Sequence, residues 1–125
     1  LKNFESSAET FTAHTANGFC KIALNDVDYL EAQNKWVLVY LSDGKVQKIR
    51  EQFSKCEGIF TPEKGFFKCH RSYIVNLSHI RQFTRTQITT AFSSSVPISR
   101  SSYAAFKDAY FAFMFDSGTN FITLD

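Results

Sequence analysis

The residues best suited to chemistry stand together in one stretch, KCHRSYIVN, at positions 68–76. A thiol, an imidazole, a guanidinium and a hydroxyl come first, and β-forming residues follow them. Such a group could serve catalysis, a metal site or a surface that binds a ligand. Cys69 and His70 are adjacent, so on a strand their side chains point to opposite faces. They therefore suit neither one shared metal ion nor a nucleophile–base pair.

The rest of the chain adds no pattern for catalysis or metal binding. A metal site needs three or four ligands, usually with short paired spacings, and neither C-x-x-C nor H-x-x-x-H occurs. The sequence also lacks the G-x-S-x-G elbow and the Gly-rich phosphate loop. We expect no catalytic residue, no metal and no cofactor, and we do not expect an enzyme.

The distribution of charge favours a binding surface instead. From position 64 to 107 the chain has seven basic residues and no acidic one, whereas the remainder has 7 basic and 12 acidic residues. This asymmetry is typical of a part that binds a polyanion, most often nucleic acid. Chance clustering of charges on a solvated face is the alternative.

Length and composition predict one domain with a packed core. The chain has 125 residues, of which 44% are hydrophobic and 14 are Phe. Three cysteines without paired spacing favour a reducing, cytoplasmic setting over a disulfide framework. No apolar run approaches the length of a membrane span, and the start lacks a signal-peptide pattern. Because the first residue is Leu1, we expect a fragment of a longer protein.

The pattern of apolar residues predicts a mainly β fold. Strands are expected at 19–24, 27–32, 36–41, 45–48, 66–76 and 87–92, with an Asp-Gly hairpin signal at 43–44. The spacing changes at Ile49, Phe53, Cys56 and Phe60, which predicts one helix over 50–57. Aromatic residues between 103 and 113 suggest a terminal helix, and Pro97 favours an edge strand. We expect a linker or leader at 1–17, the domain at 18–115 and a C-terminal tail at 116–125.

The run FFKCHRSYIVN at 66–76, followed by Ile80, resembles the signature of the LytTR-type DNA-binding domain. The motif DYLEA at 28–32, the predicted helix near Phe53 and the motif PISR at 97–100 follow in the order of that family. The resemblance covers roughly residues 18–112. It implies small antiparallel sheets with one or two short helices, and recognition of double-stranded DNA by loops between strands.

The resemblance also implies a cellular context. Members of the family are usually the output half of bacterial two-component response regulators. They follow a receiver domain, which answers to a sensor histidine kinase. Two copies on promoter repeats, and hence a possible homodimer on DNA, are implied as well. No membrane segment is expected in this fragment.

Roles for single residues follow from the resemblance. Arg100 occupies the position of a base-reading arginine, whose planar fork suits guanine O6 and N7. Asn34 and Lys35 lie in the loop where relatives often insert a histidine, which is absent here. Arg71 matches the position that approaches the minor groove, where arginine is favoured. Contacts to the DNA backbone are implied for Lys68, His70, Ser72, Ser99, Ser101 and Lys107.

Plainer interpretations of the same residues stay open. Arg100 could be an ordinary surface arginine, and residues 34–35 an ordinary hairpin turn. The run YFAFMF at 110–115 could form the apolar patch of a protein-interaction or dimerisation module, if it is exposed.

Overall fold

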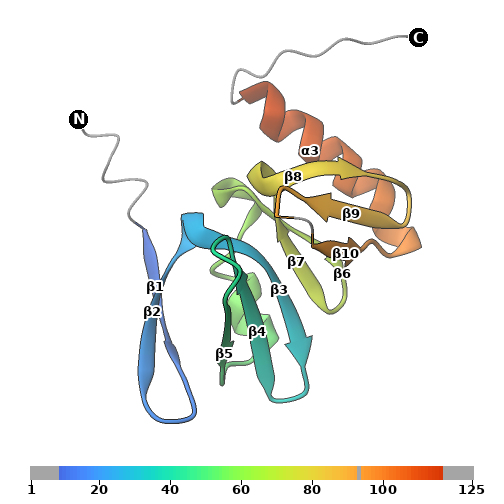
Figure 1. Cartoon of the computed structure of the whole chain (residues 1–125). Helices are drawn as coiled ribbons and strands as arrows, with labels where there is room; N and C mark the ends of the chain where they lie inside the picture. The colour runs from blue at the N-terminus through green and yellow to red at the C-terminus, as the bar shows by residue number, and fades with distance from the viewer. Residues whose placement is uncertain (1–8, 93, 117–125) are drawn as a thin grey trace, which may run out of the picture.

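The computed structural model describes residues 9–92 and 94–116, which form three antiparallel sheets and two α-helices (Figure 1). The strands are β1 (Thr10–His14), β2 (Phe19–Ala23), β3 (Val27–Gln33), β4 (Trp36–Leu41), β5 (Val46–Ile49), β6 (Phe66–His70), β7 (Tyr73–Asn76), β8 (Ile80–Phe83), β9 (Gln87–Thr90) and β10 (Ser95–Pro97). The helices are α2 (Phe53–Glu57) and α3 (Tyr103–Asp116).

The central sheet has the strand order β5-β4-β3-β7-β6. Alternation along β4 and β5 buries Val37, Val39 and Ile49 completely on one face, as a period of two requires. These residues join Phe60 and Phe66 in a first hydrophobic core, which the β1–β2 hairpin and α2 cover. The expected mainly β fold is confirmed.

The second hydrophobic core lies on the opposite face of β7 from the first. The three-stranded sheet β10-β9-β8 and helix α3 enclose it, with Ile88, Val96 and Phe106 fully buried. β10 is an edge strand, as Pro97 predicts. Phe83 packs edge-on against Phe106, with ring centroids 5.0 Å apart, and this contact helps to hold α3 on the small sheet.

The prediction that residues 10–14 belong to a linker or leader is wrong. They form β1, which pairs with β2 from Thr10↔Ala23 to His14↔Phe19. Phe11 and Ala13 alternate into the first core. Five residues with one large apolar side chain gave too weak a periodic signal. Residues 1–8 lie outside the described residues, and of the predicted tail only Asp116 is described, at the end of α3.

The single strand expected at 66–76 is in fact two strands. β6 and β7 form a hairpin, with Arg71 and Ser72 at its turn. No Gly or Pro marks this reversal, so the usual turn signal is missing. The expected helix at 50–57 is also shorter, because Gln52 is still extended and α2 begins only at Phe53.

Candidate DNA interface

Chain connections from separate parts of the sequence meet at one end of the central sheet (Figure 1). The register pairs Gln33 with Trp36, which places the β3–β4 turn there. It pairs Glu31 with Tyr73, which brings the β6–β7 turn to the same end. It pairs Ile49 with Val37, so the chain leaves β5 at this end as well. We call this end of the sheet the turn edge.

Asn34 and Lys35 form the β3–β4 turn of the turn edge, and both are exposed. Asn34 has a φ of 55°, the left-handed conformation that asparagine tolerates better than most residues. A tight two-residue turn holds both side chains out from the end of the sheet. The structure thus supports a turn at 34–35, and the roles of the two residues in reading bases remain a prediction.

The β6–β7 turn presents Arg71, which is exposed. The backbone N–H of Ser72 donates to Nδ1 of His70 at 3.1 Å, and the backbone N–H of Ala32 donates to the Ser72 carbonyl at 2.8 Å. The first bond closes the β6–β7 turn, and the second holds this turn against β3. His70 therefore has a structural role inside the hairpin, with its ring edge-on to Tyr73.

Arg100 reaches the turn edge through a contact between distant segments. The backbone N–H of Ser99 donates to the carbonyl oxygen of Cys69 at 2.9 Å. The Ser99 hydroxyl lies 2.6 Å from that of Ser102. A hollow of about 530 Å³ results, lined by Lys68, His70, Arg71, Ser99, Ser101 and Ser102. Five of the predicted DNA-contacting residues thus lie around one surface depression.

The charges in and next to this depression differ in how they are paired. Lys68 is held by Glu57, with Nζ and Oε2 2.8 Å apart, so part of its charge is offset. Within residues 9–92 and 94–116, neither Arg71 nor Arg100 has a carboxylate at ion-pair distance, and both are exposed. These two guanidinium groups are the ones free to meet an external anion.

Two further cationic side chains lie close to the ring of Tyr103 at the start of α3. The guanidinium of Arg85 lies 5.3 Å and the ammonium of Lys107 lies 5.8 Å from the centre of its ring. Arg85 comes from the β8–β9 turn, which is joined to the Arg100 segment by a bond from the Ile98 N–H to the Thr86 carbonyl. Sequence reasoning missed Arg85, because nothing in the spacing links it to Tyr103.

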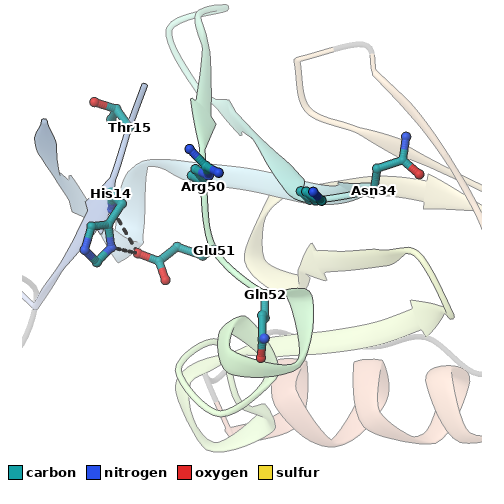
Figure 2. A pocket seen from close by; sticks show the side chains of 7 residues that line it. His14, Thr15, Asn34, Arg50, Glu51 and Gln52 are labelled. Carbon is teal, nitrogen blue, oxygen red and sulfur yellow. Dashed lines mark hydrogen bonds and ion pairs between the residues drawn. The ribbon is translucent and has the colours of Figure 1, made fainter. Parts of the chain in front are cut away.

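A second hollow, of about 620 Å³, lies beside the β3–β4 turn and is lined by His14, Thr15, Asn34, Lys35, Arg50, Glu51 and Gln52 (Figure 2). Glu51 is buried and points toward His14. It accepts a 2.8 Å bond from the His14 backbone N–H, and the imidazole Nδ1 lies 2.7 Å from the same oxygen. Sequence reasoning missed Arg50, because it was assigned to a helix.

The hydrogen bonds to the Glu51 carboxylate lower its pKa. Burial alone would raise this pKa, but the bonds from the backbone and ring of His14 and from Lys55 lower it to about 2. The carboxylate therefore stays charged at neutral pH and clamps the β1–β2 hairpin to the start of α2.

The thiol and imidazole of the 68–76 stretch have no arrangement for catalysis. Cys69 is fully buried, and burial raises its pKa to about 12, so the thiolate is not populated at neutral pH. Among residues 9–92 and 94–116, no three His, Cys, Asp or Glu side chains group closely enough to hold a metal ion.

The described residues thus combine small antiparallel sheets with an exposed, partly cationic turn edge. The chain belongs to the LytTr DNA-binding domain family, whose model matches residues 17–110. The resemblance found in the sequence is thereby confirmed. The family consists of DNA-binding transcription regulators, so the chain is not an enzyme, as expected.

Individual relatives agree with this assignment. The chain is 38% identical over 93 residues to the transcriptional regulatory protein YpdB of Escherichia coli O6:H1, and 37% identical to YpdB of strain K12. Each match covers 67% of this chain and 36% of the relative, so the chain spans about a third of the length of these proteins.

A solved structure shows the same fold. It is a LytTr DNA-binding domain of a putative methyl-accepting/DNA response regulator from Bacillus cereus, with a TM-score of 0.67 and 26% identity. The match covers 80% of this chain and 94% of that one. In the described part of this chain, no helix is long and apolar enough to cross a membrane.

Proposed function

We propose that this domain binds double-stranded DNA sequence-specifically through the loops of its turn edge. The observation that carries the proposal is the Ser99–Cys69 hydrogen bond, which brings the segment of Arg100 next to the depression that Arg71 lines. The guanidinium groups of both arginines are exposed, and within residues 9–92 and 94–116 neither has a carboxylate at ion-pair distance. An arginine guanidinium is planar and can form two parallel hydrogen bonds to the edge of a base. Fixing the backbone beside Arg100 prepares its side chain for such a contact.

The proposal gives each part of the turn edge a role. Arg100 reads guanine in one major groove, and Asn34 with Lys35 reads a neighbouring major groove from the β3–β4 turn. Arg71 enters the minor groove between them. Ser101 and Lys107 contact phosphates, which fix the register without reading sequence. Lys68 contributes a phosphate contact that is weakened by its ion pair with Glu57.

In the cell, we place this domain in the cytoplasm as the effector part of a bacterial transcription regulator. The proposed full-length system is a two-component response regulator, with a receiver domain before this segment and a sensor histidine kinase as its partner. Two copies would occupy promoter repeats as a homodimer. Sequencing the complete gene tests the receiver domain, since a different upstream domain would contradict this arrangement.

The test of DNA reading begins with selection of duplexes from a random library. Arg100→Ala and Lys107→Ala are then compared on the selected duplex and on scrambled DNA, at matched salt. Arg100→Ala should lose about 1–3 kcal/mol on the selected duplex and much less on the scrambled one. Lys107→Ala should weaken both about equally and reduce the salt slope by about one unit or less.

Two results would contradict the proposal. Either no duplex is enriched, or Arg100→Ala binds the selected duplex as well as the parent does while thermal melts show it folded. A protein-interaction module would then be the better interpretation. Phe111 and Phe115 of α3 are 45% and 73% exposed, whereas Tyr110 and Phe113 pack on the second core. Only part of the C-terminal aromatic run is therefore available to a protein partner.

A further inference from the structure

We propose that Trp36, Lys48 and Arg50 form an additional binding site for DNA backbone phosphates, here called the Trp36 platform. The inference rests on the proposed function and extends it. It adds a contact on the far side of the β3–β4 turn from Arg71 and Arg100.

The geometry of the Trp36 platform comes from two paired strands. Trp36 opens β4 directly after the turn, and Lys48 and Arg50 are two residues apart along β5 and the residue that follows it. Residues two apart point to the same face of a strand. The Lys48 ammonium lies 4.7 Å and the Arg50 guanidinium 6.0 Å from the centre of the indole ring. Both cations thus lie close to the same aromatic ring.

Both cations are available to an external anion. Lys48 and Arg50 are exposed, and within residues 9–92 and 94–116 neither has a carboxylate at ion-pair distance. Glu51 follows Arg50 directly, but its carboxylate is engaged by His14 and by Lys55, whose Nζ lies 3.3 Å away. The acid that could neutralise Arg50 is turned away from it (Figure 2).

The position of the Trp36 platform suits phosphates rather than base edges. Four strand-to-strand steps separate β5 from β6 in the central sheet, and at about 4.8 Å each they span roughly 19 Å. A major groove is only about 12 Å wide. With Arg100 at the β6 end, the Trp36 platform therefore lies beyond the major groove that Arg100 reads, at the level of a flanking DNA backbone.

The charges next to the Trp36 platform also favour a site for phosphates. Lys35 in the turn and Arg50 both line the 620 Å³ hollow, so the positive charge is continuous from the turn to the Trp36 platform. A lysine and an arginine that lie along the DNA backbone bind phosphates through their charge, and phosphate contacts carry no sequence information. We expect this site to add affinity without adding sequence preference.

The experiment uses the Lys48→Ala/Arg50→Ala double variant and a control of equal charge change, Lys21→Ala/Lys45→Ala. The control lysines are exposed, and Lys45 lies in the β4–β5 turn at the opposite end of the sheet. The logarithm of affinity is measured against the logarithm of salt concentration on selected and scrambled duplexes. Loss of two phosphate contacts should lower the slope by about two units, equally on both duplexes.

Trp36 provides a second readout, because it is the only tryptophan of the chain. Saturating duplex should protect its fluorescence from quenching by acrylamide in the parent protein. The double variant, brought to the same saturation at low salt, should lose most of this protection, while the control keeps it. Thermal melts establish that each variant is folded.

The possible outcomes separate this inference from the proposed function. If the parent enriches no duplex, both fail together. If Arg100→Ala relaxes specificity but the double variant matches the control in salt slope and in quenching, only the Trp36 platform is wrong. A loss confined to the selected duplex would also overturn it, since that result indicates base reading.

Discussion

The backbone N–H of Ser99 lies 2.9 Å from the carbonyl oxygen of Cys69, thirty positions earlier in the chain, and donates a hydrogen bond to it. This bond joins the residue before Arg100 to β6, two positions before Arg71. This main-chain contact therefore sets the position of the Arg100 segment relative to the Arg71 turn, and we propose both arginines as DNA readers. The backbone bond is the shorter of two contacts between these residues, because the Ser99 hydroxyl lies 3.5 Å from the Cys69 carbonyl and only 2.6 Å from the Ser102 hydroxyl.

Replacing Ser99 tests this positioning role directly. Ser99→Pro should lose about 1 kcal/mol of stability and relax the preference for the selected duplex, because the N–H that bonds Cys69 is removed. The φ of Ser99 is −72°, which proline adopts without strain. Ser99→Ala keeps the N–H and should retain the preference. The measurement is the affinity ratio of selected to scrambled duplex, and equal ratios for both variants would argue against backbone positioning.

Arg71 should read the shape of the minor groove more than its bases. We expect Arg71→Ala to lose about 1–2 kcal/mol on duplexes with an A·T-rich spacer and less when the spacer is G·C-rich, because a narrow groove concentrates negative potential. Arg71→Lys, which keeps the charge, is the matched control. Competition binding with the two spacer series checks this prediction. An equal loss on both series would show that Arg71 makes only a phosphate contact.

Glu51 should make stability depend on acid pH. Its pKa is about 2 in the folded protein against 4.5 for the ordinary group, so its contribution is present above pH 4.5 and is lost as the pH falls toward 2. Glu51→Gln should therefore be less stable than the parent by about 1–3 kcal/mol at pH 7, and the difference should shrink toward pH 2. Urea melts across this range measure it.

The control for Glu51 is Glu63→Gln, because Glu63 is exposed and has no ion pair within the described residues. It should change stability little at any pH. A difference between Glu51→Gln and the parent that stays constant as the pH falls would mean that the buried carboxylate is held by shape rather than by charge.

The three cysteines should differ sharply in reactivity. Cys56 and Cys69 are fully buried, and burial raises the pKa of each thiol to about 12. Cys20 is only half-buried, although burial raises its pKa as well. Iodoacetamide at pH 8 should label Cys20 first, and Cys56 and Cys69 only as the protein unfolds. Peptide mass spectrometry follows each site, and labelling of Cys69 at the rate of Cys20 would contradict this account.

Much of the local structure could be predicted from the sequence because it depends on neighbours along the chain. Alternation from Trp36 to Leu41 and the Asp-Gly pair after it specify β4 and its turn, and the predicted strand at 36–41 matches β4. The motif at 66–76 and its flanking elements were enough to indicate the family. Arg71 and Arg100 stood out as candidates on the same basis, and their individual roles stay predictions.

The turn edge was decided by the tertiary structure alone. Arg50 meets Trp36 through the pairing of β5 with β4. Arg100 meets the β6–β7 turn through the Ser99–Cys69 bond. The acid-free stretch at 64–107 also proved less positive in space than in sequence, since Glu57 approaches Lys68 from outside it. Strand register and long-range hydrogen bonds set these distances, and neither follows from the order of residues along one segment.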